Sequence, residues 1–68
     1  MNIFDVEHGD FAFFVEDNSI YDAKSRDYVY FIEDDHIFSV ESGKFVYFIE
    51  DDHIFEAHSG NFVYYIVR

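Results

Sequence analysis

The stretch Val29–Phe38 reads VYFIEDDHIF, and Val46–Phe55 repeats the same ten residues at an offset of 17. The same offset aligns positions along the whole chain, most visibly two sets: Phe11, Tyr28, Phe45 and Phe62, and Ile3, Ile20, Ile37 and Ile54. A third set is made of Gly9, Gly43 and Gly60, with Arg26 as the exception. Four times 17 is 68, so all 68 residues belong to four copies of one unit.

Each unit contains two runs that are typical of β-strands. Phe45–Glu50 (FVYFIE) is rich in aromatic and β-branched residues, and His53–His58 (HIFEAH) alternates between apolar and polar residues. Two kinds of turn separate the runs: a glycine-containing turn at 42–44 and an acidic turn at 51–52. The sequence therefore predicts an all-β fold, an eight-stranded up-and-down antiparallel meander.

The units divide the chain into one domain, 1–68, made of four hairpins. The hairpins are residues 11–27, 28–44, 45–61 and a split unit of 62–68 plus 1–10. Because the first and last strands are the two arms of one split hairpin, we expect them to pair. That pairing would remove both sheet edges and close the meander into a small barrel with pseudo-four-fold symmetry.

Loop lengths decide which residues share a face of the sheet. A two-residue turn at 51–52 pairs Phe48 with Phe55, and a three-residue turn at 42–44 pairs Phe38 with Phe48. Both choices place small and aromatic residues on one face, which suits the filled interior of a small barrel. The residues expected inside are Phe4, Val6, Ala12, Phe14, Tyr21, Ala23, Val29, Phe31, Phe38, Val40, Val46, Phe48, Phe55, Ala57, Val63 and Tyr65.

The opposite face carries Tyr30, Tyr47 and Tyr64 together with the aligned isoleucines, and we expect it to be exposed. An apolar surface of that extent usually marks an interface. Three interpretations stay open: a second copy of the chain covers it, a different protein binds it, or a flattened sandwich buries both faces.

Charge narrows the class of partner. Fifteen acidic and four basic residues give a formal charge of −11. Direct binding to nucleic acid or to an anionic membrane needs Lys and Arg, so the charge favours a basic protein as partner instead. The chain has no Cys, and its longest apolar runs are far shorter than a membrane helix. We expect a cytoplasmic location.

The acidic turns should gather at one end of the meander. A carboxylate cluster with nearby His36 and His53 could bind a divalent cation, but the spacing matches no established metal-binding loop. We therefore predict no metal and no cofactor. Catalysis also has little support, because a filled barrel of this size offers no concave pocket.

These observations predict an acidic, non-enzymatic binding protein that docks on a basic surface of a partner, of the inhibitor, immunity or nucleic-acid-mimic type. In size and charge the chain resembles, as a class only, the small acidic inhibitors encoded by phages and mobile elements. The alternative is a self-assembling structural β-repeat module with no separate ligand, and a homo-oligomer is expected. The predicted partner-binding residues are Tyr30, Tyr47, Tyr64, Glu33, Asp34, Asp35, Glu50, Asp51 and Asp52.

Overall fold

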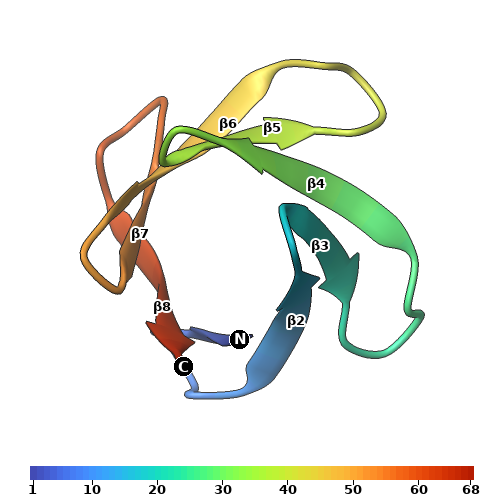
Figure 1. Ribbon diagram of the computed structural model, residues 1–68. Helices are drawn as coiled ribbons and strands as arrows, with labels where there is room; N and C mark the ends of the chain where they lie inside the picture. Colours follow the sequence, from blue (N-terminus) through green and yellow to red (C-terminus); the bar gives the residue numbers. More distant parts are fainter.

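The computed structural model describes residues 1–68 and contains eight β-strands and no helix (Figure 1). The strands are β1 (Asn2–Asp5), β2 (Phe11–Glu16), β3 (Ser19–Asp22), β4 (Tyr28–Glu33), β5 (His36–Ser39), β6 (Phe45–Glu50), β7 (His53–Glu56) and β8 (Phe62–Val67). Each strand pairs antiparallel with the next, and β1 pairs with β8, so the sheet is a closed barrel. The predicted all-β meander closed into a barrel is confirmed. There is no helix long and apolar enough to cross a membrane.

The acidic turns are two-residue hairpin turns, as the sequence predicts. Glu33 pairs with His36 and Glu50 pairs with His53, which leaves two residues in each turn. Asp34 and Asp35 have φ angles of 51° and 67°. Such turns match the twist of the flanking strands when both central residues have positive φ, a conformation that Asp tolerates better than most residues.

The glycine-containing loops differ from the prediction of a three-residue turn. Phe38 pairs with Phe45, whereas Ile37 pairs with Tyr47, so Val46 is an extra residue in a β-bulge. The Gly43 N–H donates to the Ser39 carbonyl at 2.8 Å, and Gly43 has a φ of 73°. The predicted pair of Phe38 with Phe48 was therefore wrong. The same register shift occurs in the other three units.

The prediction of which face lies inside was also wrong for all the aromatic residues that it placed there, which lie on the outer face. Most of the core is made of three sets of side chains related by the 17-residue offset: Phe13, Tyr30, Tyr47 and Tyr64; Ile3, Ile20, Ile37 and Ile54; and Val15, Ile32, Ile49 and Ile66. Val29, Val46 and Val63, which were expected inside, also pack against this core. Because the bulge turns the first aromatic residue of each unit outward, the inner face holds one ring and two aliphatic side chains per unit, and in three units the valine at the bulge packs beside them. That content fills the barrel and leaves a cavity of only about 10 Å³.

The two ends of the chain occupy the place of a fourth acidic turn. The Val15 N–H donates to the Met1 carbonyl at 2.9 Å, as the Ile32 N–H does to the Asn18 carbonyl one unit later. The Arg68 Nε lies 2.8 Å from Asp52 Oδ1 of the neighbouring turn. Figure 1 shows the termini close together beside β8. The split hairpin therefore pairs as predicted.

Candidate functional site

The outer face of the barrel carries four aromatic clusters, which we call the outer triads. Each outer triad takes one ring from each of three consecutive strands, and the bulge places the third ring beside the other two. The outer triads are Phe14–Tyr21–Tyr28, Phe31–Phe38–Phe45, Phe48–Phe55–Phe62 and Tyr65–Phe4–Phe11. Most of these residues were expected inside the barrel, so the sequence analysis did not predict this aromatic surface.

The four outer triads share one geometry. In the third, Phe48 and Phe55 are stacked with centroids 5.2 Å apart and planes 16° apart, and Phe62 is tilted by 41° at 5.7 Å from Phe55. The tilted ring is the most exposed of the three: Phe11, Tyr28, Phe45 and Phe62 are 42–46 % exposed. Each outer triad is therefore a stacked pair of rings with a third, partly exposed ring at its side.

Carboxylates and histidines lie at the ends of two outer triads. Glu50 follows Phe48 by two residues on β6, so both side chains share the outer face, and Glu50 pairs with His53 across the hairpin. The His53 ring meets Phe62 edge-on, with centroids 5.0 Å apart and planes 68° apart. Glu33, His36 and Phe45 repeat the arrangement one unit earlier.

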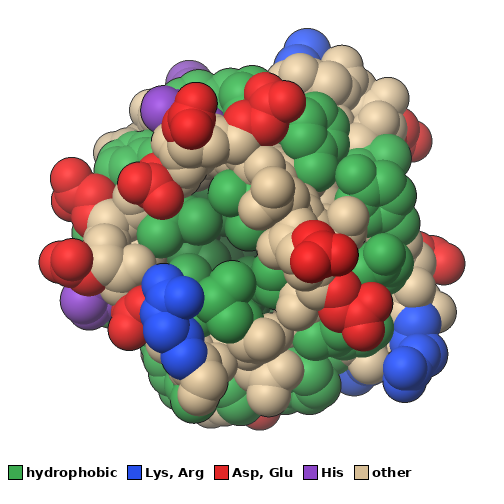
Figure 2. Space-filling model, viewed as in Figure 1, with side chains coloured by type: hydrophobic (Ala, Val, Ile, Leu, Met, Phe, Trp, Pro, Cys, Tyr) green, Lys and Arg blue, Asp and Glu red, His purple; other side chains and the backbone are tan.

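The predicted acidic residues lie together at one end of the barrel. Glu33 and Glu50 end strands β4 and β6, and the four turn aspartates Asp34, Asp35, Asp51 and Asp52 follow them in exposed positions. Figure 2 shows acidic side chains spaced around a central apolar hollow. No three His, Asp or Glu side chains come close enough to hold a metal ion.

Almost all of this negative charge lacks a partner within the chain. The only ion pair between a carboxylate and a Lys or Arg joins Arg68 to Asp52, and His8 lies 3.2 Å from Glu7. With fifteen acidic residues in the chain, the surface presents a large excess of unpaired carboxylates to any partner.

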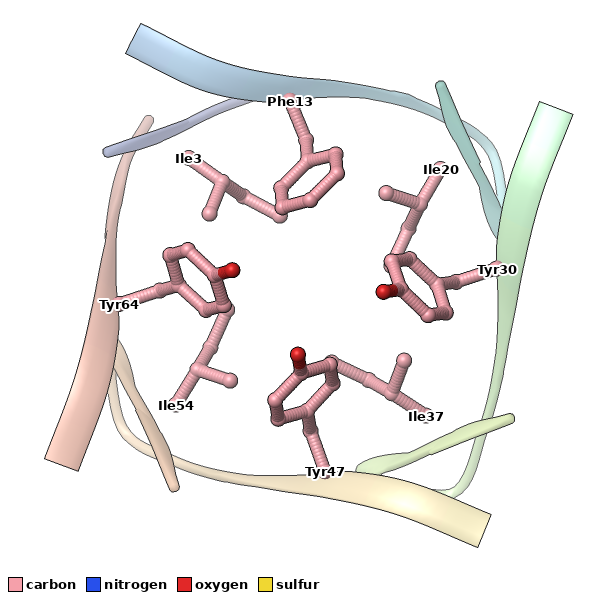
Figure 3. A pocket seen from close by; sticks show the side chains of 8 residues that line it. All are labelled: Ile3, Phe13, Ile20, Tyr30, Ile37, Tyr47, Ile54 and Tyr64. Atoms are coloured by element: carbon pink, nitrogen blue, oxygen red, sulfur yellow. The ribbon is translucent and has the colours of Figure 1, made fainter. Parts of the chain in front are cut away.

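Tyr30, Tyr47 and Tyr64 do not lie on the outer surface where the sequence analysis placed them. With Phe13 they form a ring around the barrel axis, each meeting its neighbours edge-to-face at 5.4–5.6 Å and 78–80° (Figure 3). Burial raises the pKa of the Tyr47 hydroxyl above its ordinary value of 10.0, and the nearby Tyr30 and Tyr64 raise it further. Burial likewise raises the pKa of Tyr64. The small cavity inside this ring has no room for an organic ligand.

Arg26 is the residue that the sequence reasoning noted but did not use. Its guanidinium carbon lies 5.4 Å from the centroid of the Phe14 ring, which is cation–π geometry. Arg26 occupies the loop position that is Gly9, Gly43 and Gly60 in the other units, and it keeps their conformation with a φ of 67°. The signal in the sequence was this single departure from an otherwise glycine-only position.

Comparison with protein-family models, with curated proteins and with solved structures finds no match to this chain.

Proposed function

We propose that this protein is an acidic, non-enzymatic binding protein that docks on a basic surface of a partner protein. The observation that supports it is the outer face, where exposed aromatic rings lie beside carboxylates that have no ion-pair partner in the chain. Aromatic rings attract cations through their faces, and nearby carboxylates add direct charge attraction. Lys and Arg side chains are therefore the groups that this surface fits best.

The proposed contact surface combines the outer triads with the acidic residues Glu33, Asp34, Asp35, Glu50, Asp51 and Asp52. Tyr30, Tyr47 and Tyr64 are not part of it, because they line the interior. Each strand of a closed barrel pairs with a neighbour on both sides, so the backbone holds the rings in place before binding. Binding therefore costs little conformational entropy on this side of the interface. Basic surfaces of this kind occur on nucleic-acid-binding proteins, which fits an inhibitor, immunity or nucleic-acid-mimic role in the cytoplasm.

Affinity capture from host lysate tests the proposal, with the protein as bait and washes at low and then high salt. We expect a basic, nucleic-acid-binding protein that elutes as salt rises and that duplex DNA or RNA displaces from the bait. A captured partner that resists both salt and nucleic acid would contradict the electrostatic docking mode.

The second candidate function is self-assembly without a separate ligand. It is favoured by the distribution of the outer triads, which surround the barrel and leave Phe11, Tyr28, Phe45 and Phe62 exposed. Light scattering after size-exclusion chromatography, over a range of concentrations and salt, distinguishes the two. Self-assembly predicts a salt-insensitive oligomer that Phe45→Lys with Phe62→Lys dissociates, whereas a monomer at all concentrations contradicts it.

A further inference from the structure

We infer that three of the four outer triads are receptor sites for arginine side chains of the partner, and that Arg26 already fills the fourth from within the chain. The inference rests on the proposed function for its basic partner and adds the chemical group that each site takes. Arg26 over the Phe14–Tyr21–Tyr28 triad is the structural example of how a guanidinium is held.

The glycine positions leave the corresponding space open at the other outer triads. A Cβ added at Gly43 or Gly60 would meet no atom within 4 Å, and at Gly9 it would meet only the Tyr65 hydroxyl at 3.8 Å. These glycines have φ angles of 71–77°, close to the 67° of Arg26, so the four loops share one backbone conformation. A guanidinium from another chain can therefore approach these rings as the Arg26 side chain approaches Phe14.

Local charge ranks the three open sites. Glu33 lies beside the Phe31–Phe38–Phe45 triad and Glu50 lies beside the Phe48–Phe55–Phe62 triad, each two residues along the same strand. The Tyr65–Phe4–Phe11 triad has Val67 at the corresponding position. We expect the first two to bind most strongly, because a carboxylate and an aromatic face then act on the same cation.

The proposal favours arginine over lysine. A guanidinium is planar and weakly hydrated, so it can lie flat on a ring, whereas an ammonium is compact and strongly hydrated. Labelled nona-arginine and nona-lysine peptides carry the same charge and differ in the cationic group and the stem that carries it. We expect nona-arginine to bind more tightly at equal ionic strength, measured by fluorescence anisotropy.

Filling two open triads from within the chain tests the sites directly. Gly43→Arg with Gly60→Arg should place a guanidinium over each of the two carboxylate-flanked triads, as Arg26 does over the first. The control is Glu7→Gln with Glu41→Gln, because both double variants change the formal charge from −11 to −9. We expect the arginine variant to lose about 2- to 5-fold more affinity for nona-arginine per filled triad than the control.

Emptying the occupied triad is the reverse test. Arg26→Gly should open the Phe14–Tyr21–Tyr28 triad and tighten nona-arginine binding more than Lys24→Gln, which removes one positive charge from the same loop. NMR of the wild-type protein supplies a reading that needs no partner. We expect the Arg26 Hδ protons to be shifted upfield by the Phe14 ring, and the ring signals of Phe45 and Phe62 to move on adding ethylguanidinium more than on adding ethylammonium.

The failures of the two proposals are distinguishable. If both peptides bind equally and the arginine variants behave like their charge-matched controls, the surface attracts charge alone and the arginine-receptor inference is wrong, while the proposed function stands. If neither peptide binds at low salt, the proposed function is wrong and the inference fails with it. Circular dichroism confirms the fold of each variant before binding is compared.

Discussion

Two groups of aromatic residues in this barrel, drawn from the same repeat, have opposite geometries. The inner ring of Phe13, Tyr30, Tyr47 and Tyr64 is joined edge-to-face at 78–80°, and each member touches two others. The stacked pairs of the outer triads have planes 13–17° apart, and each stack has an exposed ring at its side. The inner rings use their faces and edges in contacts with one another, whereas the outer rings leave faces and edges exposed to a partner.

This difference teaches that aromatic content alone does not indicate what a ring does. The position of a ring relative to the bulge decides whether it stabilises the barrel or remains available to a partner. Phe45 and Tyr47 are two residues apart on β6, and strict alternation would place both on one face. The bulge at Val46 separates them, so Tyr47 joins the inner ring and Phe45 joins an outer triad.

The largest expected effect comes from comparing one side chain of the core with one of the outer face. Ile37 is 2 % exposed, and Ile37→Ala should lower the free energy of unfolding by about 2–5 kcal/mol, because it leaves a cavity among packed neighbours. Phe45→Ala should cost much less, because that ring is 45 % exposed. Urea unfolding of both variants checks this, and equal losses would contradict the division into inner and outer faces.

A smaller loss of stability should follow from raising the pH, and it compares the buried inner tyrosines with the exposed outer ones. The pKa of Tyr47 is higher in the folded protein than in the unfolded chain, so its contribution to stability is complete below pH 10 and is lost as pH rises toward the folded pKa. We expect alkaline destabilisation that Tyr47→Phe reduces. Tyrosinate absorbance followed with circular dichroism measures it, and ionisation of all tyrosines near pH 10 without unfolding would contradict it. Tyr28→Phe, in an outer triad, is the control.

The smallest effect concerns the loop that carries Arg26. The Ser25 and Lys24 N–H groups donate to Asp22 Oδ1 at 2.9 and 2.8 Å and lower the pKa of the Asp22 carboxyl. The Asp22 carboxylate therefore contributes stability above the pKa that it has in the unfolded chain, and this contribution is lost as the pH falls through its lower pKa in the folded protein. Asp22→Asn should destabilise the protein slightly at neutral pH and not at pH 2. Thermal unfolding at both values tests this, and an equal loss at both would contradict it.

The sequence was sufficient for the strands, the acidic turns and the closure. All three follow from local chemistry: β-branched and aromatic runs, turn residues such as Asp34, Asp35 and Asp51 that tolerate positive φ, and a split hairpin whose arms must meet. The set of residues sharing a face was also largely correct, because parity along a strand is fixed once the two-residue turn is known. Phe48 opposite Phe55 is an example.

Which face lies inside could not be read from the pattern, because both faces are apolar and both end in charged residues. Glu50 and His53 lie at one end of the Phe48 face, and Glu56 lies at the end of the Tyr47 face. The bulge decides the question, since it removes Phe45 from the inner face. Nothing in the sequence distinguishes a three-residue turn from a longer loop with a bulge, so the predicted tyrosine site was placed on the wrong side of the sheet.

Barrel closure also has a consequence for how the chain reaches its native state. Asn2 pairs with Val67, so the ladder between β1 and β8 joins opposite ends of the chain and has the largest loop-closure entropy. We expect this ladder to form last. Until β8 docks, β1 and β7 each present an open edge with unpaired backbone groups beside apolar rings. We therefore expect barrel closure to be a late step and the folding of the whole barrel to be all-or-none. A fragment lacking β8 (Phe62–Val67) should aggregate rather than form an open seven-stranded barrel.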